Sequence, residues 1–228
     1  MTARQPRLEP RKKPVQKRSR EKVDAILAAA AQVFEEHGMA AGTTNRIAER
    51  AGVSIGTLYQ YFPCKEAVAA ALLELHASET VGLLNALVRR AAERRPGMRD
   101  VLHEYVSSMM ALHAGRPRLQ HILLEEVPRS DALHQRQTRL RQEAVGAVAR
   151  MMEASPAIAR PDLDRAAYLV VEAVECLTHR YAAHPEHQTM GEPAFVDEVV
   201  DLLEGYLTLG RGRPGHARRS RPARPAPR

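Results

Sequence analysis

Apolar residues recur every three or four positions along most of the chain, between two ends that are rich in proline and arginine. This spacing is typical of helices that bury one face, and no alternating run of β-branched residues is long enough to predict a strand. Glycine and proline interrupt the pattern and mark the helix ends. The sequence therefore predicts an all-α fold of about nine helices. They are expected at 18–37, as two short helices within 43–65, and at 65–95, 98–114, 117–127, 131–154, 161–183 and 194–209.

Residues 43–65 contain two short helices around a tight turn. Thr43 or Thr44 is expected to cap the first helix and Ser54 the second, because a hydroxyl accepts a hydrogen bond from an unpaired backbone N–H. Gly52 lies where the chain must turn, a position that favours positive φ. This is the layout of a helix-turn-helix, whose second helix enters the major groove of DNA.

The outward side chains of the second helix are uncharged, which suits the reading of base edges. Glutamine pairs with adenine, and threonine and isoleucine contact thymine methyl groups. These outward positions are Ile55, Gly56, Thr57, Tyr59, Gln60 and Tyr61. Phosphate contacts are expected from the polar groups around them. The phosphate-facing set comprises Thr44, Arg46, the hydroxyls of Tyr59 and Tyr61, and Lys65, and the predicted DNA-binding surface is completed by Thr43, Asn45 and Ser54.

This part of the chain resembles the DNA-binding region of the tetracycline-repressor (TetR) family of regulators. The resemblance rests on helix one at 18–37, then Thr44, Ile47-Ala48, Ala51 to Ser54, Gly56 to Tyr59, Tyr61-Phe62 and Lys65. It implies three helices for DNA, six for effector binding and dimerisation, and a homodimer that releases its operator when a small ligand binds. Cys64 departs from the family pattern, which usually has a polar helix cap there. The implied organisation is a basic arm at 1–17, a DNA-binding domain at 18–78, an effector and dimerisation domain at 79–210 and a tail at 211–228.

The last two helices carry wide apolar stripes that suit a helical dimer interface. The resemblance assigns the same role to these helices. Packing within one chain is the alternative explanation for the stripes. The interface candidates are Val170, Val174, Leu177, Tyr181, Val199, Val200, Leu203 and Leu207.

The middle helices, 65–154, are expected to enclose the effector pocket. Methionine is unbranched and polarizable and lines adaptable apolar sites well, but at helical spacing it also fills ordinary cores, so both interpretations stay open. The sequence does not identify the effector. The pocket candidates are Tyr105, Met109, Met110, His113, His121 and Tyr168, together with Met151 and Met152.

The basic charge of the chain lies in its two ends. Residues 1–20 and residues 211–228 each carry a net charge of +7, and the whole chain also sums to +7, so residues 21–210 carry −7. Such basic segments often bind nucleic acid or another anionic surface. Auxiliary contacts of the tails with DNA are predicted, and the Arg-Gly-Arg-Pro sequence near the end is similar to AT-hooks that enter the minor groove. A flexible or solubilising tail is the alternative. The auxiliary candidates are Lys17, Arg18, Arg20, Arg211 and Arg213.

No motif indicates catalytic residues, a cofactor or a metal site. The G-x-G-x-x-G match at 210–215 follows no strand and contains a proline, so we expect no dinucleotide site. His179, His184 and His187 match no common zinc spacing. Two cysteines make no disulfide framework. A helix start and a neighbouring lysine would favour the thiolate of Cys64 and hence a response to peroxide, but the alternative, that a lone cysteine in place of a cap is inert, is the more common case.

The helix-turn-helix predicts a DNA-binding regulator, and the resemblance implies a ligand-responsive repressor that binds a palindromic operator as a homodimer and is released by a small-molecule effector; the residues themselves do not distinguish repression from activation. The longest stretch without Asp, Glu, Lys or Arg spans 14 residues, 51–64, which is shorter than a membrane-spanning helix needs. We expect no membrane partner and a bacterial cytoplasmic protein that joins the nucleoid when it binds DNA. A nonspecific architectural DNA-binding protein driven by its basic tails is the first alternative. An all-α enzyme that uses the central pocket is the second, and no motif supports it.

Overall fold

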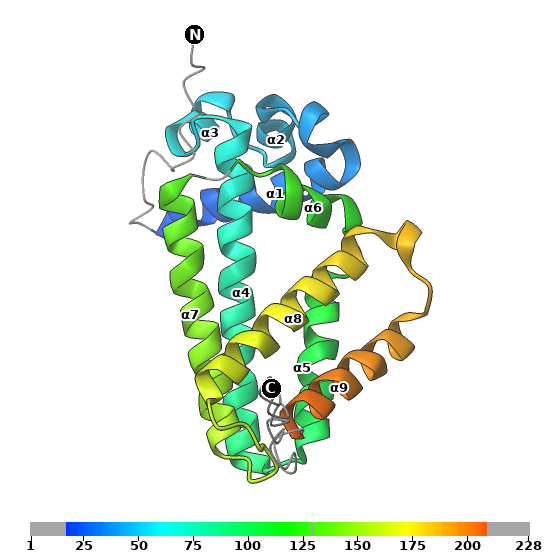
Figure 1. Ribbon diagram of the computed structural model, residues 1–228. Helices are drawn as coiled ribbons and strands as arrows, with labels where there is room; N and C mark the ends of the chain where they lie inside the picture. The colour runs from blue at the N-terminus through cyan, green and yellow to red at the C-terminus, as the bar shows by residue number, and fades with distance from the viewer. Residues whose placement is uncertain (1–16, 129, 209–228) are drawn as a thin grey trace, which may run out of the picture.

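The computed structural model describes residues 17–128 and 130–208, and these form nine α-helices and no strand, which confirms the predicted all-α fold (Figure 1). A π-helical turn, η1 (Ile122–Glu126), continues α6, so the expected helix 117–127 consists of two pieces, and a 3₁₀ turn, η2 (Pro185–His187), precedes α9. The helices are α1 (Lys17–Ala41), α2 (Thr44–Arg50), α3 (Ile55–Tyr61), α4 (Lys65–Arg94), α5 (Met98–His113), α6 (Pro117–His121), α7 (Asp131–Glu153), α8 (Leu163–Ala183) and α9 (Glu192–Thr208).

The helix ends follow from local capping. Gly38 has φ 73° and interrupts α1 directly after the predicted stop. The Ser130 hydroxyl accepts a hydrogen bond from the N–H of Leu133 at 3.2 Å and so begins α7. The Asp162 carboxylate accepts one from the N–H of Arg165 at 3.0 Å and begins α8. Each cap satisfies a backbone donor that the first turn of a helix leaves unpaired.

The buried apolar side chains form two clusters. The head cluster joins α1, α2, α3, the first half of α4 and the α6–η1 segment, and includes Phe34, Ile47 and Leu58. The body cluster joins the second half of α4 to α5, α7, α8 and α9, and includes Tyr105 and Val174. Figure 1 shows α1–α3 gathered at one end of the molecule, with α4 and α7 running side by side away from it. Helix α4 therefore belongs to both clusters.

Helix α4 is long and apolar enough to cross a membrane by length and composition alone, which our criterion of an uncharged stretch did not reveal. Half of its most apolar 18-residue window is buried inside the protein. The helix packs against α7, α5 and α1. Its apolar character is therefore explained by its place in the two clusters.

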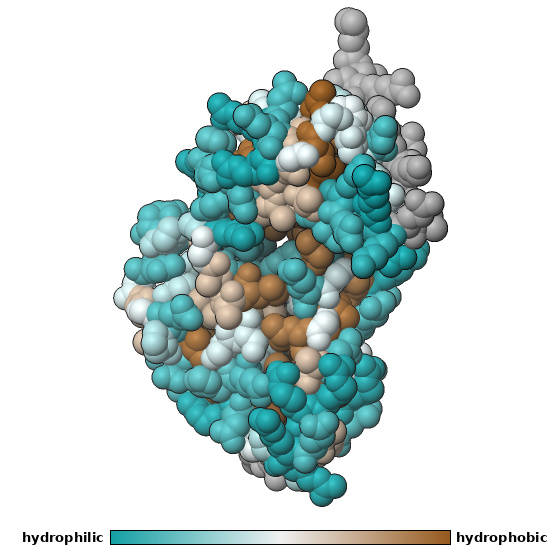
Figure 2. Space-filling view, turned by 180° about the vertical axis from the view of Figure 1, so that it is seen from behind, coloured by the Kyte–Doolittle hydropathy of each residue, from teal (hydrophilic) through white to brown (hydrophobic). Residues whose placement is uncertain are grey.

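Exposed apolar side chains concentrate on a few helices. The face seen from behind is hydrophilic along its edges and has apolar patches in its middle (Figure 2). Among the described residues, the large apolar side chains exposed to solvent are Ile55, Tyr59, Leu75, Tyr168, Leu169, Met190 and Leu202. Two of these belong to α3 and three to α8 and α9, the elements predicted for DNA reading and for dimerisation.

Candidate DNA-binding surface and effector cavity

Helices α2 and α3 begin at the hydroxyl caps that the sequence predicts. The Thr43 hydroxyl accepts a hydrogen bond from the N–H of Arg46 at 3.4 Å. The Ser54 hydroxyl accepts one from the N–H of Thr57 at 3.1 Å. Gly52, between the two helices, has φ 65°, in the left-handed region that glycine tolerates. The two helices thus meet at the tight turn of a helix-turn-helix.

The outer face of α3 is open to solvent and uncharged. Ile55 and Tyr59 are exposed by 38% and 40%, whereas Leu58 is fully buried beneath them. The Tyr59 hydroxyl lies 3.1 Å from the Thr44 hydroxyl and so joins α3 to α2. The exposed positions of the predicted surface are Thr43, Asn45, Arg46, Ser54, Ile55, Gly56, Tyr59 and Gln60, and the half-buried ones are Thr44, Thr57 and Lys65.

Tyr61 is the exception to this surface. Its side chain is only 6% exposed and lies in the head cluster with Leu58 and Phe62, so the prediction that Tyr61 points outward is wrong. Residues three and four apart share one face of a helix, and Leu58 fixes the inward face on which Tyr61 and Phe62 must also lie. The exposed face of α3 is therefore narrower than the sequence suggested.

Lys65 is engaged within the protein. Its ammonium donates to the carbonyl oxygens of Met39 at 2.7 Å and Ala40 at 2.9 Å. It thereby ties the start of α4 to the end of α1. A lysine ammonium has three N–H donors, so one remains for a phosphate oxygen.

An ion pair that the sequence analysis missed holds α2 against α1. The Arg50 guanidinium donates to both carboxylate oxygens of Glu36, at 2.5 and 2.6 Å. The hydrogen bond from Arg50 is the main cause of a lowered pKa of Glu36. The two residues are 14 positions apart, which local pattern analysis does not connect.

The predicted basic contacts divide between described and undescribed residues. Lys17, Arg18 and Arg20 are exposed at the start of α1. Arg211 and Arg213 lie outside the described residues. The side chains of Lys17, Arg18 and Arg20 are therefore accessible from solvent.

Cys64 does not have the environment expected of a reactive thiolate. The side chain is half-buried at the start of α4. Burial is the main cause of a raised pKa of its thiol. The direction of this shift is opposite to the expected stabilisation of the thiolate, because desolvation exceeds the lowering of the pKa by backbone hydrogen bonds at the helix start.

A cavity of about 730 Å³ lies in the body between α4, α5, α7, α8 and α9. Its wall is mainly apolar, with Leu102, Met152 and Val170 as examples, and it also includes Arg95 and Arg150, which are exposed. This volume is within the range of small-molecule sites, roughly 300–1,000 Å³. Methionine and arginine together give the wall both adaptable apolar surface and positive charge.

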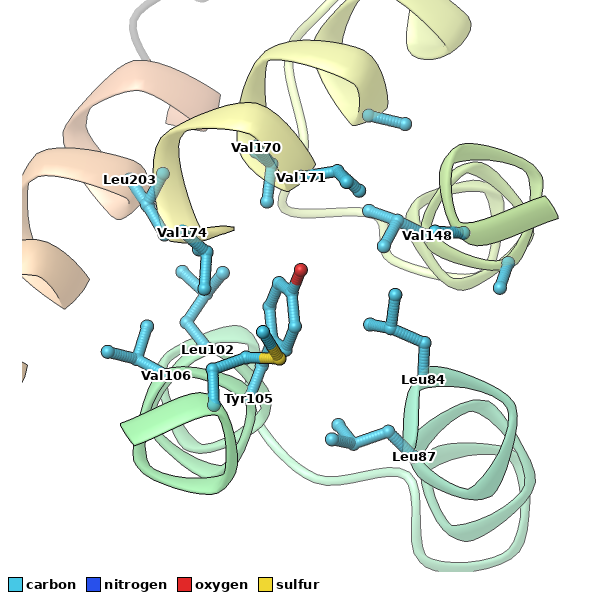
Figure 3. Packing of buried hydrophobic residues seen from close by; sticks show 14 of the residues in the cluster. Leu84, Leu87, Leu102, Tyr105, Val106, Val148, Val170, Val171, Val174 and Leu203 are labelled. Atoms are coloured by element: carbon cyan, nitrogen blue, oxygen red, sulfur yellow. The ribbon is translucent and has the colours of Figure 1, made fainter. Parts of the chain in front are cut away.

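Tyr105 is the central polar group of this region. Figure 3 shows its ring among Leu84 and Leu87 of α4 and Val170 and Val174 of α8. Its hydroxyl is buried and has no hydrogen-bond partner among the residues that the structure describes. Burial is the main cause of a raised pKa of Tyr105. A buried hydroxyl without a partner is costly, so this group is suited to bind a polar atom of a ligand.

The remaining pocket candidates are scattered. Met109, Met110 and His113 are buried but do not line the cavity, whereas Met151 and Met152 do. Tyr168 is 46% exposed and also lies outside the cavity. His121 packs near His184 instead, with ring centroids 5.5 Å apart. Tyr105 is the one member of the six-residue set that the structure places in the cavity wall.

The apolar stripes predicted for dimerisation are filled within the chain. Val170, Val174, Val199, Val200, Leu203 and Leu207 are all at most 4% exposed, and Leu177 and Tyr181 are partly buried against the same cluster. The alternative of intrachain packing is therefore correct for the six buried residues, because α5 covers both α8 and α9. The exposed apolar side chains of these helices are instead Tyr168, Leu169 and Leu202.

Four titratable side chains meet where α4, the end of α5 and α8 approach one another. They are His76, His113, Glu175 and His179, and one ligand atom from each lies within 4.8 Å of all the others. Our expectation of no metal site rested on short-range spacing, which does not address residues from three helices. Two partly exposed groups of the described residues also combine histidine and glutamate: His121, Glu125 and His184, and His184, Glu186 and His187.

Two family models match the chain. The model described as "Bacterial regulatory proteins, tetR family" matches residues 26–72. The model described as "Tetracyclin repressor-like, C-terminal domain" matches residues 97–207. The first covers α2, α3 and parts of α1 and α4, and the second covers α5 to α8 and most of α9, which include the helices that surround the cavity together with α4.

Curated relatives match less than half of the chain. The nucleoid occlusion factor SlmA of Actinobacillus pleuropneumoniae is 30% identical over 102 residues, which are 45% of this chain and 49% of that protein. The transcriptional activator FasR of Mycolicibacterium smegmatis is 32% identical over 80 residues, which are 35% of this chain and 36% of that protein. The chain thus spans about half or less of the length of these curated relatives.

Solved structures match the fold over most of the chain. A TetR-family regulator of Mesorhizobium loti has a TM-score of 0.68 at 17% identity, over 85% of this chain and 98% of that one. The regulator FadR of Bacillus subtilis, solved with stearoyl-CoA, has a TM-score of 0.61 at 21% identity, over 79% of this chain and 96% of that one. At these identities the matches show a shared fold.

Proposed function

The chain belongs to the tetR family of bacterial regulatory proteins and is a DNA-binding transcriptional regulator; on that premise we propose that it is a repressor released by an effector. It binds a palindromic operator as a homodimer, and a small effector with an apolar chain and an anionic end enters the body cavity. The observation that carries the proposal is the pairing, on one chain, of an exposed uncharged recognition helix with an apolar cavity of about 730 Å³.

The operator is read by α3. Gln60 offers an amide to adenine, and Ile55 and Thr57 offer methyl groups to thymine. Arg46 and the remaining donor of Lys65 reach phosphates and hold the helix in the groove. In a twofold dimer the two copies of α3 lie about 34 Å apart and read the two half-sites of a palindrome.

The dimer forms through the outer faces of α8 and α9. Leu169 and Leu202 are exposed by 44% and 59%, and large exposed apolar side chains on neighbouring helices are typical of protein interfaces. The inner stripes of both helices already pack against α5, which gives the interface a rigid base. We retain the division into a DNA-binding domain at 18–78 and an effector and dimerisation domain at 79–210.

The effector is an acyl compound. The cavity wall is mostly apolar, and Arg95 and Arg150 provide positive charge beside it. Tyr105 adds a buried hydroxyl with no partner among the described residues. FadR of Bacillus subtilis, which shares the fold, was solved with stearoyl-CoA. An acyl chain would occupy the apolar part and its carboxylate or phosphate groups the arginine side.

Release requires the effector to prefer the conformation that does not fit the operator, because an effector with equal affinity for both conformations leaves their populations unchanged. Helix α4 connects the two events, since it runs from the head cluster to the cavity. Filling the cavity between α4, α5 and α8 would displace α4 and with it the spacing of the two recognition helices.

Selection of bound duplexes from a random DNA pool by the full-length protein tests operator reading. We expect an enriched palindrome, and we expect Gln60→Ala to relax the preference at one base pair of each half-site by about 1–3 kcal/mol. Gln142→Ala, at an exposed position of α7, is the matched control and should keep the wild-type preference. Binding with no enriched sequence would instead support the architectural alternative, in which the basic tails supply the affinity.

Titration of the selected complex with palmitate and palmitoyl-CoA tests the effector. We expect release of the wild-type protein and a large loss of that response in Ala91→Leu, which fills part of the cavity wall. Ala28→Leu, at an exposed position of α1, should respond like wild type. An unchanged complex at saturating acyl ligand would rule out this effector class.

A further inference from the structure

A polar layer separates the two apolar clusters at the middle of α4. The last head-cluster contact of the helix is at Leu73 and the first body-cluster contact is at Val81. His76 lies between them, facing His113 at the end of α5 and the Glu175–His179 pair on α8. We call these four residues the histidine junction.

The distances within the histidine junction lie on both sides of the ligand spacing of a metal site. The Nε2 atoms of His76 and His113 are 2.9 Å apart, and His76 Nε2 is 3.6 Å from Glu175 Oε1. The ligand atoms of all four residues lie within 4.8 Å of one another. In a tetrahedral zinc site with metal–nitrogen distances near 2.05 Å, ligand atoms are about 3.3 Å apart. Small side-chain rotations would therefore bring the four atoms around one ion.

The outer hydrogen bonds also suit metal ligation. His179 Nε2 lies 3.0 Å from the carbonyl oxygen of Gln120. A carbonyl can only accept, so Nε2 carries the proton and the lone pair of His179 is on Nδ1. Histidine ligands in metal sites almost always donate their other N–H in this way. This bond fixes both the tautomer and the orientation of the ring.

Two buried atoms of the histidine junction are left without a hydrogen bond. Within the described part of the chain, His113 Nδ1 and Glu175 Oε2 have no hydrogen-bond partner. His113 is fully buried, so water does not reach its side chain. An ordinary polar core pairs such atoms, so the hydrogen bonds of the histidine junction do not satisfy all of its buried polar groups.

An entry path adjoins the site. A small cavity of about 100 Å³ is lined by His76, Thr80 and Glu175 and also by Arg141. The side chain of Glu175 is 36% exposed although its Oε2 atom is enclosed. An ion can therefore reach the carboxylate from solvent and pass to the imidazoles behind it.

We propose that His76, His113, Glu175 and His179 bind one divalent transition-metal ion of the zinc type. Three imidazoles and one carboxylate form a closed tetrahedral donor set that suits zinc and excludes the all-oxygen shells of calcium and magnesium. The ion joins α4, α5 and α8 at the level where the two clusters meet.

Hydrogen bonds through α6 connect the histidine junction with the DNA-binding end of the protein. The His179–Gln120 bond leads to α6, where the Arg118 guanidinium donates to the carbonyl oxygen of Glu36 at 3.0 Å. The N–H of Leu119 donates to the Glu35 carboxylate at 2.8 Å. Both acceptors are on α1. Metal-dependent operator affinity is the regulatory consequence, and this part rests on the proposed function.

Titration of chelator-treated full-length protein with Co²⁺ tests the site. We expect one Co²⁺ per chain, the intense visible absorption of a tetrahedral ion, and its displacement by Zn²⁺. Glu175→Gln keeps the shape of the side chain and should weaken Co²⁺ binding roughly 10–100-fold, by analogy with losses at metal sites. His179→Gln should abolish the tetrahedral spectrum. Helical circular dichroism checks that both variants remain folded.

The surface group His121, Glu125 and His184 provides the matched control. His184→Gln should leave stoichiometry, affinity and spectrum unchanged. A spectrum that disappears in His184→Gln but persists in Glu175→Gln and His179→Gln would overturn the proposal, because the ion would then belong to the surface group. Absence of any Co²⁺ or Zn²⁺ binding by folded wild-type protein would overturn it equally.

Operator binding with and without Zn²⁺ tests the regulatory part separately. We expect Zn²⁺ to change the affinity of wild type at least threefold and that of Glu175→Gln less than that. Stoichiometric Co²⁺ binding with unchanged operator affinity would refute regulation by the metal and support the site. Failure to select any operator would refute the proposed function, while the Co²⁺ result would still decide the metal site.

Discussion

The head and the body of this protein are packed differently. The head cluster fills the space between α1, α2, α3 and the first half of α4 with large apolar side chains such as Phe34, Leu58 and Phe62. The body cluster surrounds a cavity of about 730 Å³. A surface that reads base edges needs fixed geometry, whereas a site that accepts a ligand needs space. The difference shows how one chain meets both demands.

Equivalent truncations in the two clusters give the largest expected contrast. Leu58→Ala should lower the free energy of unfolding by about 3–5 kcal/mol and Leu102→Ala by about 2–3 kcal/mol. Both side chains are almost fully buried, but Leu102 borders the cavity and has fewer contacts to lose. Denaturant unfolding measures both. Equal losses would mean that the cavity wall is as tightly packed as the head.

A pair of glycine substitutions sharpens the comparison through backbone space. Gly42→Ala would place its Cβ 2.5 Å from Phe34 Cδ1 and 2.8 Å from the carbonyl oxygen of Gly38, and should destabilise the protein by about 1–3 kcal/mol. Gly82→Ala, within α4, meets no atom within 4 Å and should stabilise by about 0.5–1 kcal/mol. Thermal unfolding gives the sign of each change. Unchanged thermal stability of Gly42→Ala would show that the head cluster has room for the added methyl group.

Tyr105→Phe tests whether the body keeps a polar group for its ligand at the expense of stability. Removal of a buried hydroxyl that has no partner among the described residues should stabilise the ligand-free protein by about 1 kcal/mol. The same change should weaken acyl-ligand binding several-fold, because the hydroxyl can no longer bind the ligand. Unfolding and ligand titration of the same variant measure both effects. A loss of stability would indicate that the hydroxyl already has a partner.

The Glu36–Arg50 pair gives the smallest expected effect. The pKa of Glu36 is lowered from 4.5 in the folded protein, so its contribution to stability is present above pH 4.5 and is lost as the pH falls through the lowered value. Wild type should therefore lose slightly more thermal stability than Glu36→Gln between about pH 5 and about pH 3. The pair is exposed, which limits its contribution. If the melting temperatures of wild type and Glu36→Gln fall by the same amount across this pH range, the pair does not contribute to stability.

Local signals predicted the helix boundaries well. Gly38, Ser130 and Asp162 end or begin helices through their own backbone angle or cap, and such signals need only a few neighbouring residues. The helix-turn-helix was predicted for the same reason. The π turn after α6 was missed, because no residue type in 122–126 marks it.

Contacts between distant residues explain what the sequence could not predict. Tyr61 was expected outside because its type suits DNA contact, yet the position of Leu58 directs it inward. The apolar stripes of α8 and α9 predicted burial correctly but not the partner, which is α5 of the same chain. His76 and His113 are 37 residues apart and meet only after α4, α5 and α8 have packed.

Because α4 is one continuous helix, a tilt of the helix moves both of its ends. A helix of 30 residues is about 45 Å long at 1.5 Å per residue, so a tilt of about 5° around its midpoint displaces each end by about 2 Å. Its first turns pack in the head cluster and its second half packs in the body cluster beside the cavity. The helix contains no proline, the residue that most often causes a kink. The histidine junction lies near this midpoint. If it holds the helix there, a small displacement of α4 beside the cavity produces a displacement of similar size at the DNA-binding end.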